Sequence, residues 1–188
     1  MGSKLINFML FQAAWFSCVL SAVDDTPLVG LVVASGAVAL HLAFVPRPRA
    51  EFTLVLGALG VGLLFDSLLL NAGWLRYPSG EWLPGFAPYW ILAIWAVFAT
   101  TLNVSMAWLR GRPALSMLMG GIFGPLSYQA GAQLGGLEFI DKSAAMMALA
   151  IGWAVIMPSL LALAARLDGT AAQPELAASA LPEGRLQP

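Results

Sequence analysis

The stretch Phe52-Thr-Leu-Val-Leu-Gly-Ala-Leu-Gly-Val-Gly-Leu-Leu-Phe-Asp66-Ser-Leu-Leu-Leu-Asn71 decides the fold class. It is long enough to cross a bilayer as a helix, because such a span needs about 20 mainly apolar residues. Asp66 is the acidic side chain that falls well inside this run. A carboxylate in hydrocarbon costs roughly 2.5 kcal/mol or more on insertion scales, so Asp66 must face protein or water. The pattern therefore predicts a membrane helix with one polar position that needs partners.

The composition extends this prediction to the whole chain. Of the 188 residues, 60% are apolar and 10% are charged, and the mean hydropathy is +0.81. Soluble domains contain about 25% charged residues, so the chain belongs to a different class. The net charge of −1 gives no sign of a nucleic-acid partner. One cysteine and one histidine exclude an internal disulfide and a multi-histidine metal site within one chain, and we expect no metal and no cofactor.

The apolar runs predict an all-α polytopic transmembrane bundle of six spans, forming one domain over residues 1–165. The approximate spans are 5–23, 27–45, 52–72, 87–109, 114–134 and 143–163. Helices are expected because only helices satisfy their own backbone hydrogen bonds in lipid, and the runs are too long for barrel strands. The first run is too long for a cleaved signal peptide. Residues 166–188 lack periodicity, which predicts a disordered cytoplasmic tail.

The placement of Lys and Arg predicts the orientation of these spans. Cytoplasmic loops carry an excess of Lys and Arg. With the N-terminus in the cytoplasm, the inside segments hold Lys4, Arg47, Arg49, Arg110, Arg112, Arg166 and Arg185, and the outside segments hold Arg76 and Lys142. The bias therefore predicts that both termini are cytoplasmic.

This orientation divides the polar side chains within the spans by depth. The predicted outer polar set is Asp66, Asn71, Tyr128 and Gln129; the predicted inner polar set is Asn7, Gln12, His41 and Asn103. The outer set can be a hydrogen-bonded clamp between helices, which we favour, or it can hold a functional carboxylate that takes up a proton or a polar substrate group. Arg110 and Arg112 are candidates to hold lipid phosphate, although positive charge also serves orientation alone.

Two further stretches predict how the helices meet. Gly120 and Gly124 form a small-x-x-x-small pair just before Pro125, which favours the close approach of another helix. Gly57, Gly60 and Gly62 indicate a similar approach on the third span, so we expect these two helices to be neighbours. The long loop over residues 73–88 is rich in Trp and Tyr, which favours a headgroup-level belt over a lid.

Several short motifs resemble a family of small bacterial inner-membrane proteins of unknown function. They are Leu5-Ile-Asn7-Phe-Met-Leu-Phe-Gln12, Leu40-His41-Leu42, Phe65-Asp66-Ser67, Thr101-Leu102-Asn103, Trp108-Leu109-Arg110-Gly111-Arg112-Pro113 and Gly124-Pro125-Leu126-Ser127-Tyr128. The likeness covers roughly residues 5–163. It implies a six-span protein of the bacterial inner membrane without an established activity. Members of the family are often encoded near enzymes that modify membrane fatty acids.

No residue pattern for catalysis is found. The chain has no paired carboxylates within one span, no histidine box and no glycine-rich phosphate loop, so we assign no catalytic residue. We expect a non-enzymatic membrane partner or scaffold linked to membrane-lipid modification. The alternative is a small transporter or flippase-like protein that uses Asp66, and a membrane-embedded lipid-modifying enzyme comes third. The expected partners are membrane lipid and a second membrane protein or another copy of the chain.

Overall fold

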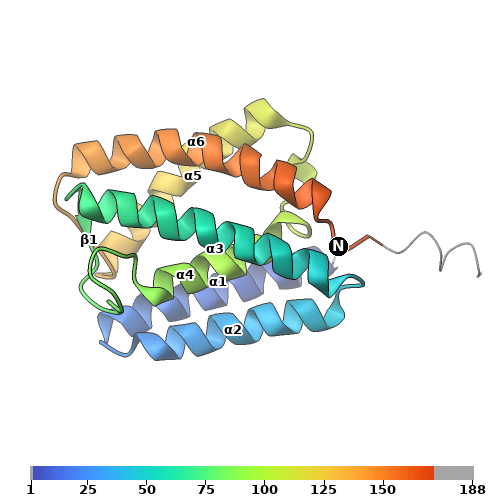
Figure 1. The fold of residues 1–188 in the computed structure, drawn as a ribbon, viewed down its shortest axis with the longest axis horizontal. Coiled ribbons are helices and arrows are strands. Elements are labelled where there is room, and N and C mark those ends of the chain that lie inside the picture. The colour runs from blue at the N-terminus through green and yellow to red at the C-terminus, as the bar shows by residue number, and fades with distance from the viewer. Residues whose placement is uncertain (1, 172–188) are drawn as a thin grey trace, which may run out of the picture.

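The computed structural model describes residues 2–171 and shows an all-α bundle of six helices, which confirms the all-α part of the predicted fold class (Figure 1). The helices are α1 (Gly2–Val23), α2 (Pro27–Phe44), α3 (Pro48–Asn71), α4 (Tyr89–Leu102), α5 (Pro113–Gln133) and α6 (Lys142–Arg166). A short 3-10 helix, η1 (Ala107–Leu109), precedes α5. Two two-residue strands, β1 (Leu75–Arg76) and β2 (Glu138–Phe139), pair antiparallel and join the long loop to the α5–α6 connection.

Four of the helices, α1, α2, α3 and α6, are long and apolar enough to cross a membrane. Helix α4 is apolar but shorter, with 14 residues. Helix α5 has 21 residues and contains Gly120, Gly124 and Pro125, which lower its hydropathy. The chain is therefore a multi-pass membrane protein by the length and composition of its helices.

The shortest of the six helices lies at the centre of the bundle. Helix α4 packs against α1, α2 and α3, and ten of its 14 residues are buried. A helix that is apolar on all sides belongs in an interior. The paired helices α1 and α2 lie on one side of it, and α5 pairs with α6 on the other (Figure 1).

The observed helix ends differ most from the predicted spans at the start of α3 and at the end of α4. Helix α3 begins at Pro48, where proline suits the first helical turn, so residue 51 lies inside it. Helix α4 ends at Leu102, seven residues before the predicted end at 109. Near this end the hydroxyls of Thr100 and Thr101 donate to the carbonyls of Val97 and Phe98. Such back-bonding weakens a helix, and an irregular segment follows.

The glycine pair of α5 allows a close approach, as predicted, but the neighbour is α6. A Cβ on Gly120 would lie 2.3 Å from the carbonyl oxygen of Trp153, and one on Gly124 would lie 2.3 Å from its Cγ. The expectation that the glycine face of α5 packs against α3 is therefore wrong. Helix α3 packs on α4 and α6, and the ring of Trp95 covers Gly62.

Residues 166–170, which the sequence analysis assigned to a disordered tail, are ordered. Helix α6 ends at Arg166, and residues 167–170 fold back against α3. The backbone NH of Arg47 donates to the carbonyl of Gly169 over 3.0 Å. The remainder of the predicted tail, residues 172–188, lies outside the described residues.

Candidate functional site

Asp66 lies on the buried face of α3 and is fully enclosed, with 0% of its surface exposed. Its Oδ1 accepts hydrogen bonds from the hydroxyls of Tyr77 (2.6 Å) and Tyr128 (2.7 Å). Its Oδ2 accepts from Nε1 of Trp95 (2.7 Å). We call these four residues the Asp66 cluster. Three neutral donors from α4, α5 and the long loop thus converge on one carboxyl group of α3.

The sequence around the Asp66 cluster makes room for its large rings. Gly62 lies one turn before Asp66, and a Cβ there would lie 2.3 Å from Cγ of Trp95. The Trp95 ring stacks on Trp153, with centroids 4.9 Å apart and planes 11° apart. Gly124 leaves the space for Trp153 on the other side. Small residues on two helices therefore position the indole that donates to Asp66.

This geometry favours the clamp interpretation of Asp66. Inside a membrane protein, a carboxyl group whose oxygens accept hydrogen bonds from neighbouring helices joins those helices, and it needs no water as a partner. Tyr77 belongs to the loop after α3, so the same group also secures that loop over the end of the bundle. Ser79 strengthens the closure because its hydroxyl donates to the carbonyl of Ala22 over 2.7 Å. The loop is therefore a folded cover that the bundle holds by specific side chains.

The rest of the predicted outer set does not join the Asp66 cluster. Asn71 instead ends α3, where its Nδ2 donates to the carbonyls of Ser67 (2.7 Å) and Gly85 (2.6 Å). Gln129 forms no hydrogen bond with another residue of the described chain. Of the four predicted outer residues, the structure brings together Asp66 and Tyr128.

A second buried carboxyl group, Glu51, lies at the other end of α3 and is also 0% exposed. Its Oε2 lies 3.0 Å from Nε2 of His41, on α2. Its Oε1 accepts from Nδ2 of Asn103 (2.6 Å) and from the backbone NH of Gly169 (2.8 Å). His41 and Asn103 of the predicted inner set therefore meet at an acid that the sequence analysis did not single out.

The contacts of Glu51 continue outward through charged groups. Arg110 donates through Nη2 to Oδ1 of Asn103 and through Nη1 to Oδ2 of Asp168, the latter over 2.8 Å. Arg47 donates through Nη2 to the carbonyl of Asp168. We call Glu51, His41, Asn103, Arg110 and Asp168 the Glu51 cluster. It ties α2, α3 and the segment before α5 to the residues that follow α6.

Asp168 is the member of this cluster that lies beyond the last helix. Partial burial acts to raise the pKa of its carboxyl group. Hydrogen bonds from Thr170 and Arg110, together with the charge of Arg110, outweigh burial and hold that pKa below its usual value. Asp168 is therefore held as the carboxylate that pairs with Arg110.

The other predicted inner residues lie elsewhere. Asn7 donates from Nδ2 to the carbonyl of Thr100 over 3.2 Å and does not reach Glu51. Gln12 faces a cavity between α1 and α5. Arg110 points inward to Asn103 and Asp168, and Arg112 is exposed. Arg110 is therefore occupied by protein partners, whereas Arg112 remains open to lipid phosphate.

Sequence reasoning missed Glu51, Tyr77, Trp95 and Asp168 as members of these clusters. Glu51 could have been found from the helix start, because Pro48 predicts a first turn that includes residue 51. Positions 51, 55, 58, 62 and 66 then fall on one helical face. Tyr77 and Asp168 carry no such signal, because they come from segments without a helical period.

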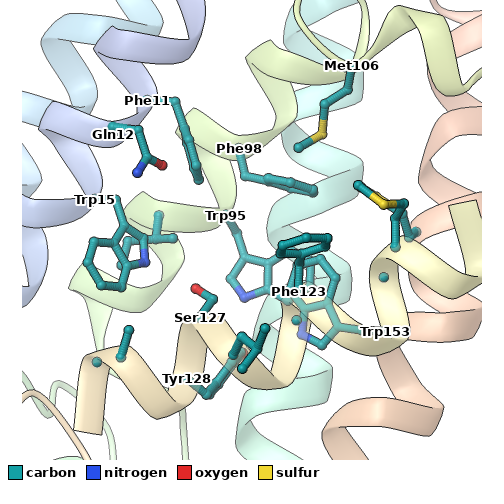
Figure 2. A pocket seen from close by; sticks show the side chains of 18 of the residues that line it. Phe11, Gln12, Trp15, Trp95, Phe98, Met106, Phe123, Ser127, Tyr128 and Trp153 are labelled. Carbon is teal, nitrogen blue, oxygen red and sulfur yellow. The ribbon is translucent and has the colours of Figure 1, made fainter. Parts of the chain in front are cut away.

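A cavity of about 650 Å³ opens between α1 and α5 (Figure 2). Ligand pockets commonly have about 300–1,000 Å³ and mostly apolar or aromatic walls. We call this cavity the aromatic groove; its ring-bearing walls include Phe11 and Trp15 of α1, Trp95 and Phe98 of α4, Phe123 and Tyr128 of α5, and Trp153 of α6.

The edge of the aromatic groove is exposed on the lateral surface of the bundle. Phe16, Trp108 and Phe123 border it and are 46%, 46% and 56% exposed. Its inner wall is buried, with Trp95 at 3% and Tyr128 at 7%. Tyr128 and Trp95 thus form part of the groove wall while they donate to Asp66, which lies behind them.

Among residues 2–171, no group of three or more His, Cys, Asp or Glu side chains is arranged to hold a metal ion. Residues 4–159 match the model of a protein family described as "Protein of unknown function (DUF2878)". No curated protein and no solved structure matches the chain.

Proposed function

The chain belongs to the DUF2878 family of unknown function, and we propose that it is a lipid-binding, non-enzymatic protein of the bacterial cytoplasmic membrane. In this proposal the aromatic groove takes up the apolar chain of a membrane lipid. The observation that carries it is the lateral opening of a buried, ring-lined cavity between α1 and α5. A site that opens sideways is reached from the bilayer without passage through water.

The proposed topology has six membrane crossings with both termini in the cytoplasm. The surface of α5 supports a crossing by this helix, because its exposed residues include Met117, Leu118, Ile122, Phe123 and Leu126. Apolar side chains at the surface of a membrane protein face lipid. The N-terminus of α1 and the end of α6 also lie at the same end of the bundle (Figure 1), as an even number of crossings requires.

The two polar clusters support a role without catalysis. The carboxyl oxygens of Asp66 and Glu51 are all engaged by protein partners, and neither side chain is exposed. A catalytic acid or base needs access to a proton of the substrate. We therefore propose that both carboxyl groups hold the helices together. In this proposal the chain binds lipid as a non-enzymatic partner of enzymes that modify lipids.

The transporter alternative rests on one contact. Tyr128 both lines the aromatic groove and donates to Asp66 over 2.7 Å. A ligand that displaced this hydroxyl would reach the carboxyl group. The full set of donors on Asp66 and its zero exposure favour lipid binding over transport.

Photo-cross-linking tests the proposal. The purified chain is placed in bilayers that contain a phospholipid with a diazirine in its acyl chain, and the labelled peptides are mapped by mass spectrometry. Ser127 projects into the groove (Figure 2), so Ser127→Phe fills it with a ring. We expect labelling of the groove residues of α1 and α5 to fall about tenfold in this variant.

Val32→Phe provides the matched control, because Val32 lies on α2 and is 69% exposed. The control must keep the labelling pattern of the parent chain. Equal labelling of the groove and the outer face of α2 in the parent chain would contradict the proposal. The same holds if Ser127→Phe leaves the groove labelling unchanged.

A further inference from the structure

Two polar side chains that line the aromatic groove have no hydrogen-bond partner in the described part of the chain. Gln12 and Ser127 extend into the groove from α1 and α5 (Figure 2), and neither side chain hydrogen-bonds to another residue of the described chain. An unpaired polar group within hydrocarbon is strongly unfavourable, because it loses its hydrogen bonds to water without replacement. These groups therefore indicate an occupant that is not pure hydrocarbon.

The kind of unpaired group limits the chemistry of this occupant. The amide of Gln12 offers two N–H donors beside its carbonyl. A partner for these donors must therefore carry an acceptor oxygen. A saturated acyl chain has none, and a carbonyl group provides two lone pairs in a compact form.

The depth of Gln12 in the bilayer limits which acceptor group can reach it. Gln12 lies about 15 Å along α1 from its start and about 16 Å from its end, at a rise of about 1.5 Å per residue. The hydrocarbon core is about 30 Å thick, so the Gln12 side chain lies near its middle. The ester carbonyls of a phospholipid lie at the edge of this core and do not reach it.

The walls of the groove favour a flat ring as the carrier of the acceptors. Trp95 and Trp153 stack at 4.9 Å, and Phe98 meets Trp153 edge to face at 5.4 Å. Phe11 meets Phe98 at 6.0 Å on the α1 side. Rings attract one another through stacked or edge-to-face contacts in addition to the burial of their apolar surface. The volume of about 650 Å³ accommodates a ring with the first part of a chain.

We propose that the aromatic groove binds a lipid quinone, whose ring carbonyl accepts a hydrogen bond from Gln12 near the middle of the bilayer. This inference rests on the proposed function, because it names the lipid that the lateral groove selects. The ring lies among the aromatic walls, and the chain leaves through the opening bordered by Phe16 and Phe123. The shared chemistry is a carbonyl acceptor on an apolar chain, which an oxo-fatty acid also carries.

The test uses the full chain in bilayers of saturated phosphatidylcholine. A benzoquinone with a decyl chain is titrated while tryptophan fluorescence is recorded. Quinones quench indoles, and five Trp side chains line the groove: Trp15, Trp90, Trp95, Trp108 and Trp153. Decylbenzene, which lacks the carbonyls, and 12-oxo-octadecanoic acid serve as competitors. We expect saturable quenching, which decylbenzene reverses only at concentrations at least about tenfold above those at which the quinone saturates it.

Gln12→Leu is the decisive variant, and Gln129→Leu is its matched control on a glutamine that does not line the groove. Losing one donor to a carbonyl in an apolar site is expected to weaken quinone binding about tenfold in Gln12→Leu. Gln129→Leu must bind as the parent chain does. Equal binding by Gln12→Leu and the parent, or equal competition by decylbenzene, would overturn the proposal.

The outcomes separate this inference from the proposed function. Preferential binding of the oxo acid would overturn the assignment to a quinone. Absence of quinone binding together with strong diazirine labelling of the groove would overturn the quinone and leave acyl-chain binding intact. Absence of both would overturn the two proposals together.

Discussion

Glu51 and Asp66 occupy the same buried face of α3, and each is 0% exposed. They are 66 − 51 = 15 residues apart, which corresponds to about 22 Å of helical rise. Leu54, Val55 and Ala58 fill the face between them with apolar surface. The helix therefore carries two separate polar anchors, one toward each end, with a dry segment between them.

The first prediction concerns the Asp66 cluster. Asp66→Asn keeps an oxygen for Tyr77 and Tyr128 but turns an N–H donor toward Trp95, so we expect a loss of about 1 kcal/mol in the free energy of unfolding. Asp66→Leu leaves all three donors unpaired and should cost about 3 kcal/mol or more. Thermal unfolding in detergent measures both. A leucine variant as stable as the asparagine variant would contradict the clamp.

The second prediction concerns the segment after α6. Glu51→Leu removes the acceptor of the Gly169 amide and of Asn103, so residues 167–170 should detach from α3. Hydrogen exchange at Gly169 should then accelerate at least about tenfold, as expected when a protecting contact is lost. Glu81→Leu, in the exposed part of the loop, is the control and must leave this exchange rate unchanged. Protection of Gly169 in Glu51→Leu would disprove the attachment.

The third prediction concerns pH. The pKa of Asp168 in the folded chain lies below its unfolded value, mainly through hydrogen bonds from Thr170 and Arg110 that outweigh burial. Its contribution to stability is therefore complete above the unfolded pKa of about 3.9 and is lost as pH falls through the folded pKa. Hydrogen exchange at Thr170, corrected for intrinsic rates, should show release of the segment only below about pH 4. Asp168→Asn should remove this pH dependence; a transition that persists in the variant would assign it to another group.

The fourth prediction concerns helix packing. Gly124→Ala places a Cβ within 2.3 Å of the Trp153 ring, so α5 and α6 must separate or the ring must move. Overpacking of this kind costs about 1–3 kcal/mol or more. Gly60→Ala is the control, since nothing lies within 4 Å of its new Cβ, and it should be neutral or stabilising by up to about 1 kcal/mol. Equal unfolding temperatures of the two variants would show that the α5–α6 contact tolerates the added methyl group.

The fifth prediction concerns orientation. A reporter that is active only in the periplasm should give a signal when fused after Glu81 and none when fused after Arg49. The reason is the excess of Lys and Arg in the segments assigned to the cytoplasm. The opposite pattern would reverse the orientation while leaving the clusters and the groove unchanged.

The sequence predicted the helices well because each apolar run has the length that a helix in lipid requires. It also identified Asp66 and Tyr128, since both polar side chains interrupt otherwise apolar surfaces. It could not supply Tyr77, which reaches Asp66 from a loop, or Gly169, which reaches Glu51 through its backbone NH. Contacts of this kind depend on how segments distant in the sequence meet in the fold. The spacing of apolar residues along one helix does not indicate them.

The aromatic groove could not be predicted from the sequence for a related reason. Phe11, Phe98 and Phe123 look like any lipid-facing or core residues until the helices that carry them are placed. Gln12 was grouped by depth with the inner polar residues, but its side chain turns toward the groove instead (Figure 2). Depth follows from position along a helix, whereas direction depends on which neighbour the helix acquires.

Helix α4 has 14 residues and rises about 21 Å, roughly 9 Å less than the hydrocarbon core. The Glu51 cluster lies where α4 stops, between the longer helices α3 and α6. The protein thus supplies its own polar partners to the charged groups at the end where its central helix falls short of the hydrocarbon thickness. A bilayer with shorter chains would bring water closer to this cluster, so membrane thickness becomes a variable that acts selectively on one end of the molecule.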